Sequence, residues 1–298
     1  MQRPRQGAGT PSMTATVPRE LVHRAAVAET LLTGWSRTGP DRFQVSAQWP
    51  RAHELHVSSD RTSYDPLLVV ETVRQSGTLI AHTEYDVPLG HHFVLNEFQV
   101  ETFRRHLAVE ALPAELTVEV AFTDVRYRGT RPSAARYTAD VLRAGERVAR
   151  ADVAFTCLND AVYRRLRGEP SRSSAVPLWP GLPATGVERV SAADVVLAPT
   201  DASDRWQLRV DTAHPVFFDH PLDHVPGMLL LEAARQAAWW WTDGKRAPVA
   251  YHARFHRYAE LDSPLWIGLT SEDGTELQVV AEQGESTIFE CRVGTAGR

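Results

Sequence analysis

An internal repeat is the feature that most constrains the fold of this chain. Residues 51–77 (RAHELHVSSDRTSYDPLLVVETVRQSG) align without a gap on residues 212–238 (TAHPVFFDHPLDHVPGMLLLEAARQAA), at a constant offset of 161 positions. Four of the matched pairs are polar: His53 and His214, Glu71 and Glu232, Arg74 and Arg235, Gln75 and Gln236. A repeat of this kind indicates two copies of one structural unit.

The repeat extends beyond this stretch and divides the chain. Residues 22–32 (VHRAAVAETLL) resemble residues 187–197 (VERVSAADVVL), and residues 41–49 resemble residues 204–211. The stretch between the two copies is rich in Pro, Gly and Ser, which is typical of a linker. We therefore predict a flexible tail over 1–19, a first unit over 20–167, a linker over 168–186 and a second unit over 187–298.

Each unit is predicted to combine one buried helix with an antiparallel sheet. Residues 66–84 and 227–241 are apolar on nearly all sides, which is typical of a helix enclosed by other elements. The runs after each helix alternate apolar and polar residues between turns that contain glycine, as strands with one solvent-facing side do. These runs cover residues 116–128, 134–145, 147–158, 264–272, 275–284 and 286–294. The predicted fold class is α+β, with a curved sheet around one long helix in each unit.

Composition excludes several classes of protein. The net charge of −5 does not favour binding to nucleic acid or to an anionic membrane, and no apolar run reaches the length of a membrane span. The N-terminal stretch has no signal-peptide hydrophobic region, so we expect a cytoplasmic protein. Cys157 and Cys291 lie in strand-like runs and are predicted to be reduced structural thiols. The twelve histidines show no metal-ligand spacing, and we expect no metal and no cofactor.

The motifs of the repeat resemble those of known families. The second unit resembles the β-hydroxyacyl-acyl-carrier-protein dehydratases of the hotdog fold. It matches their P-G-x-L-x-x-E-A-x-x-Q pattern at Pro226, Gly227, Leu229, Glu232, Ala233 and Gln236. From about residue 22 to residue 295, the chain is more similar to the A-factor biosynthesis (AfsA-type) family of tandem-hotdog γ-butyrolactone and butenolide synthases. The similarity rests on YDPLLVVETVRQSGTLIAHTEYDVPLGHHF in the first unit and HPVFFDHPLDHVPGMLLLEAARQ in the second, and it implies a double hotdog fold.

The resemblance to the AfsA-type family implies an acyl transfer. In that family a β-ketoacyl group passes from an acyl-carrier-protein thioester to the hydroxyl of dihydroxyacetone phosphate. The ester then condenses to a butenolide phosphate, a precursor of signalling molecules. The implied partners are acyl carrier protein and dihydroxyacetone phosphate. Two alternatives stay open: a hotdog dehydratase or thioesterase that acts on an acyl thioester, and a non-catalytic sensor of an acyl ligand.

The start of the second helix is a candidate site for the thioester. Backbone N–H groups in the first turn of a helix have no intrahelical partner and carry partial positive charge. Gly227 allows a carbonyl to approach these groups, which would stabilise a developing oxyanion. His220 lies in the preceding loop, which the dehydratase resemblance directs into the site, and it is a candidate proton shuttle.

The glutamates of the repeat are candidate acids or bases because the helices around them are apolar. Burial disfavours the charged form of Glu232, which would raise its pKa and suit a general acid or base. Glu71 is the second candidate. Gln236 and Gln75, four residues after each glutamate, are either substrate contacts or hydrogen bonds at helix ends and between the halves.

The arginines of the repeat are candidate phosphate ligands. Arg235 and Arg74 each follow a glutamate by three residues, and a guanidinium can bind a phosphate through two parallel hydrogen bonds. An ordinary i,i+3 ion pair is the alternative for each pair. The first unit has Asp-Pro at 65–66 where the second has Pro-Gly, so its helix start is less open. We therefore expect one principal site centred on Glu232 and Arg235, with Arg74 or Glu71 contributing from across a pseudo-twofold axis or serving the structure.

Overall fold

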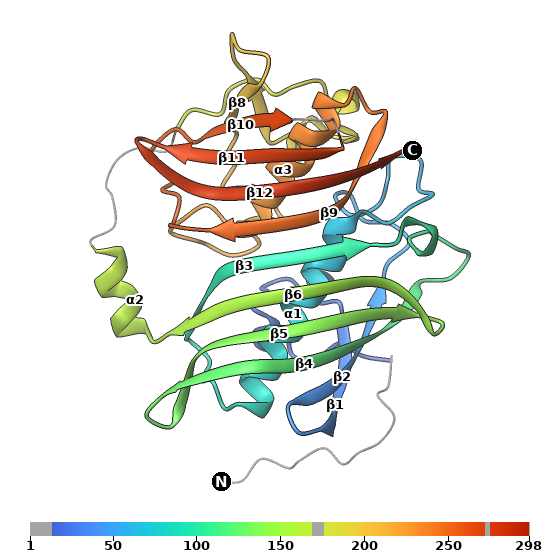
Figure 1. The fold of residues 1–298 in the computed structure, drawn as a ribbon, viewed down its shortest axis with the longest axis vertical. Helices are drawn as coiled ribbons and strands as arrows, with labels where there is room; N and C mark the ends of the chain where they lie inside the picture. The colour runs from blue at the N-terminus through green and yellow to red at the C-terminus, as the bar shows by residue number, and fades with distance from the viewer. Residues whose placement is uncertain (1–13, 169–175, 272–274, 298) are drawn as a thin grey trace.

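The computed structural model describes residues 14–168, 176–271 and 275–297, whose strands form one continuous antiparallel sheet (Figure 1). The strands of its first half are β1 (Leu32–Gly39), β2 (Arg42–Trp49), β3 (His92–Thr102), β4 (Ala114–Arg128), β5 (Arg131–Arg143) and β6 (Glu146–Leu158). Those of its second half are β7 (Leu197–Pro199), β8 (Arg205–Leu208), β9 (Arg246–Phe255), β10 (Trp266–Ser271), β11 (Glu276–Gln283) and β12 (Ser286–Gly297). The α-helices are α1 (Pro66–Glu84), α2 (Asp160–Arg167) and α3 (Gly227–Trp241). Short 3-10 helices are η1 (Arg19–Val22), η2 (Val27–Glu29), η3 (Arg104–His106), η4 (Ala184–Val187) and η5 (Ala192–Asp194).

The order of the strands shows a pseudo-twofold arrangement. They lie in the order β1-β2-β4-β5-β6-β3-β9-β12-β11-β10-β8-β7, so each strand of the first half has a counterpart at the same distance from the centre. The halves meet where β3 pairs with β9, from Glu97 opposite Arg254 to Glu101 opposite Ala250. Helix α1 lies against the sheet of the first half and α3 against that of the second (Figure 1). This arrangement confirms the predicted α+β class with two hotdog units.

Local sequence explains how α1 starts and how closely the sheet encloses it. The carboxylate of Asp65 accepts a hydrogen bond from the backbone N–H of Leu67 at 2.9 Å, which caps the helix. Pro66 occupies the first helical position, where a missing N–H costs no helical hydrogen bond. A Cβ atom added at Gly77 would lie 2.4 Å from the ring of Tyr137 on β5. Glycine therefore permits the close contact between this helix and its sheet.

Helix α2 connects the first half to the second. The hydroxyl of Tyr163 donates to Asp223 at 2.6 Å, and Arg167 forms ion pairs with Asp223 at 3.1 Å and with Glu260 at 2.6 Å. These contacts hold the loop before α3 against the end of the first unit. Residues 1–13 of the predicted tail and 169–175 of the predicted linker lie outside the described residues, so the predicted boundaries stay a prediction.

Three further predictions concern the membrane, the cysteines and metals. Among the described residues, no helix is both long and apolar enough to cross a membrane. Cys157 and Cys291 are buried and form no disulfide with each other. In the same described part of the chain, no group of three or more His, Cys, Asp or Glu side chains is placed to hold a metal ion.

Candidate active site

Two polar clusters occupy equivalent places in the two halves. The first cluster consists of Arg24, Glu71, Arg74 and Gln75, and the second cluster consists of Arg189, Glu232, Arg235 and Gln236. The glutamate of each cluster, Glu71 on α1 and Glu232 on α3, is 1 % exposed. Arg24 and Arg189 are not predicted from the helix motif. The signal for them is the alignment of residues 22–32 with 187–197, which places one opposite the other.

The glutamines of the two clusters position the glutamates. Gln75 donates to Glu71 at 2.7 Å and accepts from the backbone N–H of Leu31 at 3.0 Å. Gln236 makes the equivalent contacts in the second half and donates to Glu232 at 2.6 Å. Both glutamines are fully buried, which fits the hydrogen-bonding alternative for them better than a substrate contact.

In the first cluster, Glu71 is held by two guanidinium groups. Nη2 of Arg24 lies 2.7 Å from its Oε1, and Arg74 donates to it from Nε and Nη2 at 2.8 and 2.7 Å. Burial raises the pKa of Glu71, but Arg24 and Arg74 more than offset this and hold the pKa well below its usual value. Arg74 is 25 % exposed, and its Nη1 makes no hydrogen bond within the described residues. Glu71 is therefore ionised and holds Arg74 in place. The Nη1 group of Arg74 remains available for an anion.

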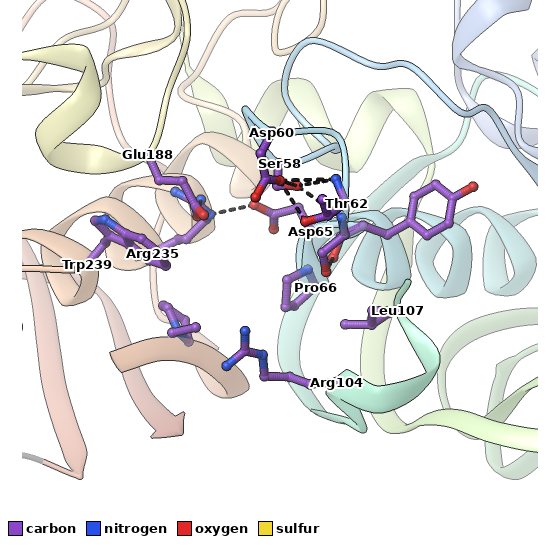
Figure 2. Close-up of a pocket in the computed structure, with 14 residues that line it drawn as sticks. Ser58, Asp60, Thr62, Asp65, Pro66, Arg104, Leu107, Glu188, Arg235 and Trp239 are labelled. Carbon is purple, nitrogen blue, oxygen red and sulfur yellow. Dashed lines mark hydrogen bonds and ion pairs between the residues drawn. The ribbon is translucent and has the colours of Figure 1, made fainter. Parts of the chain in front are cut away.

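The second cluster is closed by carboxylates. Nε of Arg235 lies 2.5 Å from the carboxylate of Asp65 at the start of α1, and its Nη2 lies 2.6 Å from Glu188 (Figure 2). Nη2 of Arg189 lies 2.6 Å from Glu232 and 3.4 Å from Asp65. Three carboxylates thus face two guanidinium groups, and the pocket beside them has a volume of only about 100 Å³. Carboxylates thus neutralise both guanidinium groups of this cluster, which disfavours the binding of a further anion here.

The repeat explains why the first cluster is not closed in the same way. The position of Asp65 corresponds to Pro226 in the second unit, and the position of Glu188 corresponds to His23 in the first unit. Neither counterpart carries a negative charge. The two charges that neutralise the second cluster are therefore missing from the first.

A cavity of about 400 Å³ lies beside the first cluster, between the two halves. Arg74 reaches it from α1, and β3 contributes residues 92–96. The second half contributes residues from the loop 216–226, from the start of α3 and from 255–259. Its apolar lining includes Phe93, Leu95, Leu222, Met228, Leu230 and Phe255. An apolar cavity with a few convergent polar groups is typical of a small-molecule site.

The first turn of α3 borders this cavity. Pro226 is its N-cap and supplies no side-chain acceptor, and the N–H groups of Gly227 and Met228 make no hydrogen bond within the described residues. A Cβ atom added at Gly227 would lie 3.1 Å from the ring of Phe255, so a larger residue would crowd the turn. Two backbone donors are thus available where a carbonyl oxygen can develop negative charge.

His220 lies at the same cavity and is paired with a carboxylate. Its Nδ1 is 2.5 Å from Oδ1 of Asp219, so an N–H at Nδ1 donates to the carboxylate and leaves Nε2 as a base. The Asp219 side chain is buried and also accepts from the backbone N–H of Ala25 at 2.9 Å, with Arg24 at 3.6 Å. Contacts from the first half therefore orient the imidazole of the second.

A second imidazole at the cavity belongs to His23. Its Nε2 lies 2.8 Å from Nε2 of His82, whose Nδ1 lies 2.7 Å from the carbonyl oxygen of Val87. A carbonyl only accepts, so Nδ1 of His82 carries the hydrogen, and neutral His82 accepts from His23. Burial, together with His82 and Arg74, lowers the pKa of His23 to about 3. Neutral His23 therefore has an unprotonated Nδ1. It is not predicted from the sequence, because its counterpart in the repeat is a glutamate.

The structure brings together only part of the predicted site. The cavity is lined by three of the predicted residues: Gly227, His220 and Arg74. Glu232 and Arg235 lie in the second cluster instead, because the pseudo-twofold axis sets the start of each central helix against the cluster of the other half. The catalytic roles predicted for Glu232 and Glu71 stay predictions. The geometry favours the ion-pair alternative for both.

This fold and site define a hotdog protein with two fused units and an open cavity between them. Solved structures support the architecture. The 12:0-ACP thioesterase from Umbellularia californica matches 88% of this chain and 100% of its own, with a TM-score of 0.55 and 14% identity. An acyl-ACP thioesterase from Bacteroides thetaiotaomicron VPI-5482 matches 85% of this chain and 98% of its own, with a TM-score of 0.52 and 12% identity. At such identities the likeness shows the fold alone.

Sequence comparison identifies the family. The model of the AfsA A-factor biosynthesis hotdog domain matches residues 6–159 and 181–291. A relative from Streptomyces virginiae is 46% identical over 293 residues, which cover 96% of this chain and 99% of the relative. A relative from Streptomyces coelicolor is 40% identical over 280 residues, which cover 92% of this chain and 89% of the relative. Both are named 2-oxo-3-(phosphooxy)propyl 3-oxoalkanoate synthase. The chain belongs to the AfsA family, as its motifs predict.

Proposed function

We propose that this chain transfers a 3-oxoacyl group from a thioester to the hydroxyl of dihydroxyacetone phosphate. The product is the 2-oxo-3-(phosphooxy)propyl 3-oxoalkanoate for which its Streptomyces relatives are named. One observation carries the proposal: a single cavity joins an apolar lining, the free N–H groups that start α3, and the guanidinium of Arg74. These groups suit an acyl chain, an oxyanion and a phosphate, respectively.

The transfer uses the groups at the cavity in a defined order. Nε2 of His220 accepts the proton of the substrate hydroxyl while the hydroxyl oxygen attacks the thioester carbonyl carbon. The N–H groups of Gly227 and Met228 donate to the oxyanion that forms. The C–S bond then breaks, and His220 returns the proton to the thiolate. Afterwards the carbon between the two carbonyls of the ester attacks the triose ketone, and loss of water gives a butenolide phosphate.

His220 suits the role of base better than the other candidates at the cavity. Asp219 stabilises the imidazolium that forms when His220 accepts a proton. The neutral partner of His23 offers no such charge, and its pKa of about 3 makes it a weak base. Glu71 is ion-paired with two arginines and has a strongly lowered pKa, so it is also a weak base. His23 is suited to orient the hydroxyl as a hydrogen-bond acceptor.

Arg74 is the proposed phosphate ligand, and acyl carrier protein is the proposed acyl donor. Arg74 is fixed by Glu71 on one side and presents Nη1 on the other, which suits a phosphate oxygen. An acyl-carrier-protein thioester can place its acyl chain in the cavity while the carrier stays outside. Because both proposed substrates are cytoplasmic metabolites, we also propose the cytoplasm as the compartment.

Mass spectrometry of one incubation tests the function. The purified chain is mixed with a 3-oxoacyl carrier protein and dihydroxyacetone phosphate, and a parallel reaction replaces the carrier with a pantetheine thioester. A phosphorylated ester or its dehydrated ring is the expected product. Release of free 3-oxo acid alone would identify a thioesterase. Binding of the acyl group without turnover would identify a sensor.

A matched pair of variants tests the phosphate site. Arg74→Lys removes the guanidinium and with it the Nη1 group beside the cavity, and we expect the KM for dihydroxyacetone phosphate to rise about tenfold or more. Arg235→Lys makes the same change in the closed cluster, and we expect it to lower stability without a comparable change in this KM. Equal KM values for the two variants would argue against Arg74 as the phosphate ligand.

A further inference from the structure

His56 occupies a position that the other half fills with phenylalanine. Residues 56 and 217 are related by the offset of 161 in the repeat. The backbone N–H of His56 donates to Nδ1 of His53 at 3.2 Å, and that of Phe217 donates to Nδ1 of His214 at 3.3 Å. The two ring pairs have centroid distances of 4.6 and 4.5 Å and interplanar angles of 32° and 34°. Both halves therefore pack an aromatic ring here, and the second half shows that this packing does not need an imidazole.

The imidazole of His56 is a poor choice for stability alone. His56 is 3 % exposed and lines the cavity, and its Nδ1 is buried without a hydrogen-bond partner within the described residues. A buried polar atom without a partner loses the hydrogen bonds that it makes to water in the unfolded chain. Phenylalanine, which fits at the equivalent position 217, would avoid this loss.

The surroundings of His56 keep it neutral. Burial and the neighbouring imidazole of His53 lower its pKa to about 3, although Asp65 and Glu71 act in the opposite direction. Arg189 adds to the lowering. A neutral imidazole carries one N–H group. Buried N–H groups are left unpaired more rarely than buried acceptors, so Nδ1 is assigned the lone pair. The hydrogen then lies on Nε2, the nitrogen left to face the cavity.

We propose that Nε2 of His56 donates a hydrogen bond to the 3-oxo group of the acyl chain and so selects 3-oxoacyl over saturated acyl substrates. This inference rests on the proposed function. Phe217, Met228 and Leu230 line the same cavity, and a neutral donor combined with an apolar lining matches a hydrocarbon chain that carries one oxygen. A phosphate would instead bind the charged group of Arg74. A saturated chain would leave the His56 donor buried without a partner, which opposes its binding.

The test compares two acyl donors of equal chain length, one 3-oxoacyl and one saturated, in transfer to dihydroxyacetone phosphate. We expect the unmodified chain to prefer the 3-oxoacyl donor by about tenfold to a hundredfold in kcat/KM. His56→Phe places at 56 the residue already present at 217, and we expect the ratio to fall to about one. Most of the change should be slower transfer of the 3-oxoacyl group.

Controls separate this inference from the proposed function. Phe217→Leu reshapes the same cavity without removing a donor, so we expect it to slow both substrates and keep their ratio. A His56→Phe variant that retains the original ratio would overturn the inference, and so would an unmodified chain with no preference. In both cases the proposed transfer would stand. Transfer of neither acyl group by the unmodified chain would instead overturn the proposed function.

A second measurement applies if His56→Phe does not fold. The ring nitrogens of His56 are observed by NMR in the unmodified ¹⁵N-histidine-labelled chain, with unreactive thioether analogues of the two donors. We expect the 3-oxo analogue to shift the Nε2 signal and the saturated analogue to leave it nearly unchanged. Equal shifts with both analogues would overturn the inference.

Discussion

Replacing Asp65 with asparagine tests how the second cluster is held closed. Oδ2 of Asp65 lies 2.5 Å from Nε of Arg235 and 3.4 Å from Nη2 of Arg189, while Oδ1 accepts from the backbone N–H of Leu67 at 2.9 Å. The Asp65 side chain is 5 % exposed, so water screens these contacts little. Asparagine has the same shape and keeps an oxygen for the helix cap. Asp65→Asn therefore removes the charge and also replaces Oδ2, which accepts from Nε of Arg235, with an amide NH2 that can only donate.

The lowered pKa of Asp65 and the cost of breaking a buried ion pair together set the size of the effect. Burial raises the pKa of Asp65, but Arg235 and Arg189 outweigh it and lower the pKa from 3.8 to about 2, which corresponds to roughly 2–3 kcal/mol at pH 7. Removing one partner of a buried ion pair costs about 3–5 kcal/mol, and Arg235 retains Glu188, which favours the lower end. We therefore expect the free energy of unfolding to fall by about 3 kcal/mol.

The same pKa sets the pH dependence of this effect. Because the pKa of Asp65 is lower in the folded chain, its contribution is present above about pH 4 and is lost as the pH falls through about 2. Urea denaturation at pH 7, followed by tryptophan fluorescence, measures the difference. Asp243→Asn is the control, since Asp243 pairs with Lys245 at an exposed site and should leave stability nearly unchanged. If Asp65→Asn were no more destabilising than this control, the glutamates alone would neutralise the two arginines.

Three further substitutions test the open site. His220→Gln should lower kcat about 10²- to 10⁴-fold with little change in the KM for dihydroxyacetone phosphate, as steady-state kinetics would show; an unchanged kcat would exclude His220 as the base. Gly227→Ala places a Cβ atom 3.1 Å from Phe255 and should lower kcat/KM for the acyl donor about tenfold or more while thermal unfolding stays close to that of the unmodified chain. Glu71→Gln should loosen Arg74, raise the KM for dihydroxyacetone phosphate and lower stability by about 3 kcal/mol. A large loss of kcat at constant KM would instead favour Glu71 as a base.

The sequence by itself determined the two units, their buried helices and the asymmetry between the helix starts. These properties are local, because an apolar run, an aspartate cap or a Pro-Gly pair acts through residues close by in the chain. Within residues 51–77 and 212–238, the repeat then relates one unit to the other by a constant offset of 161. Gly227 and His220, which line the cavity, could be predicted from residues 214–236 together with their resemblance to the dehydratase pattern.

Only the tertiary structure decided which glutamate lies beside which helix start. The pairing of β3 with β9 builds the pseudo-twofold axis, and that axis sets the start of α3 against the cluster of Glu71 rather than that of Glu232. Asp65 neutralises Arg235 in the second cluster, and His82 orients His23 at the cavity. Both contacts join residues that are far apart in the sequence. No local pattern encodes such contacts, because they form only when distant segments pack together and lose water around their charges.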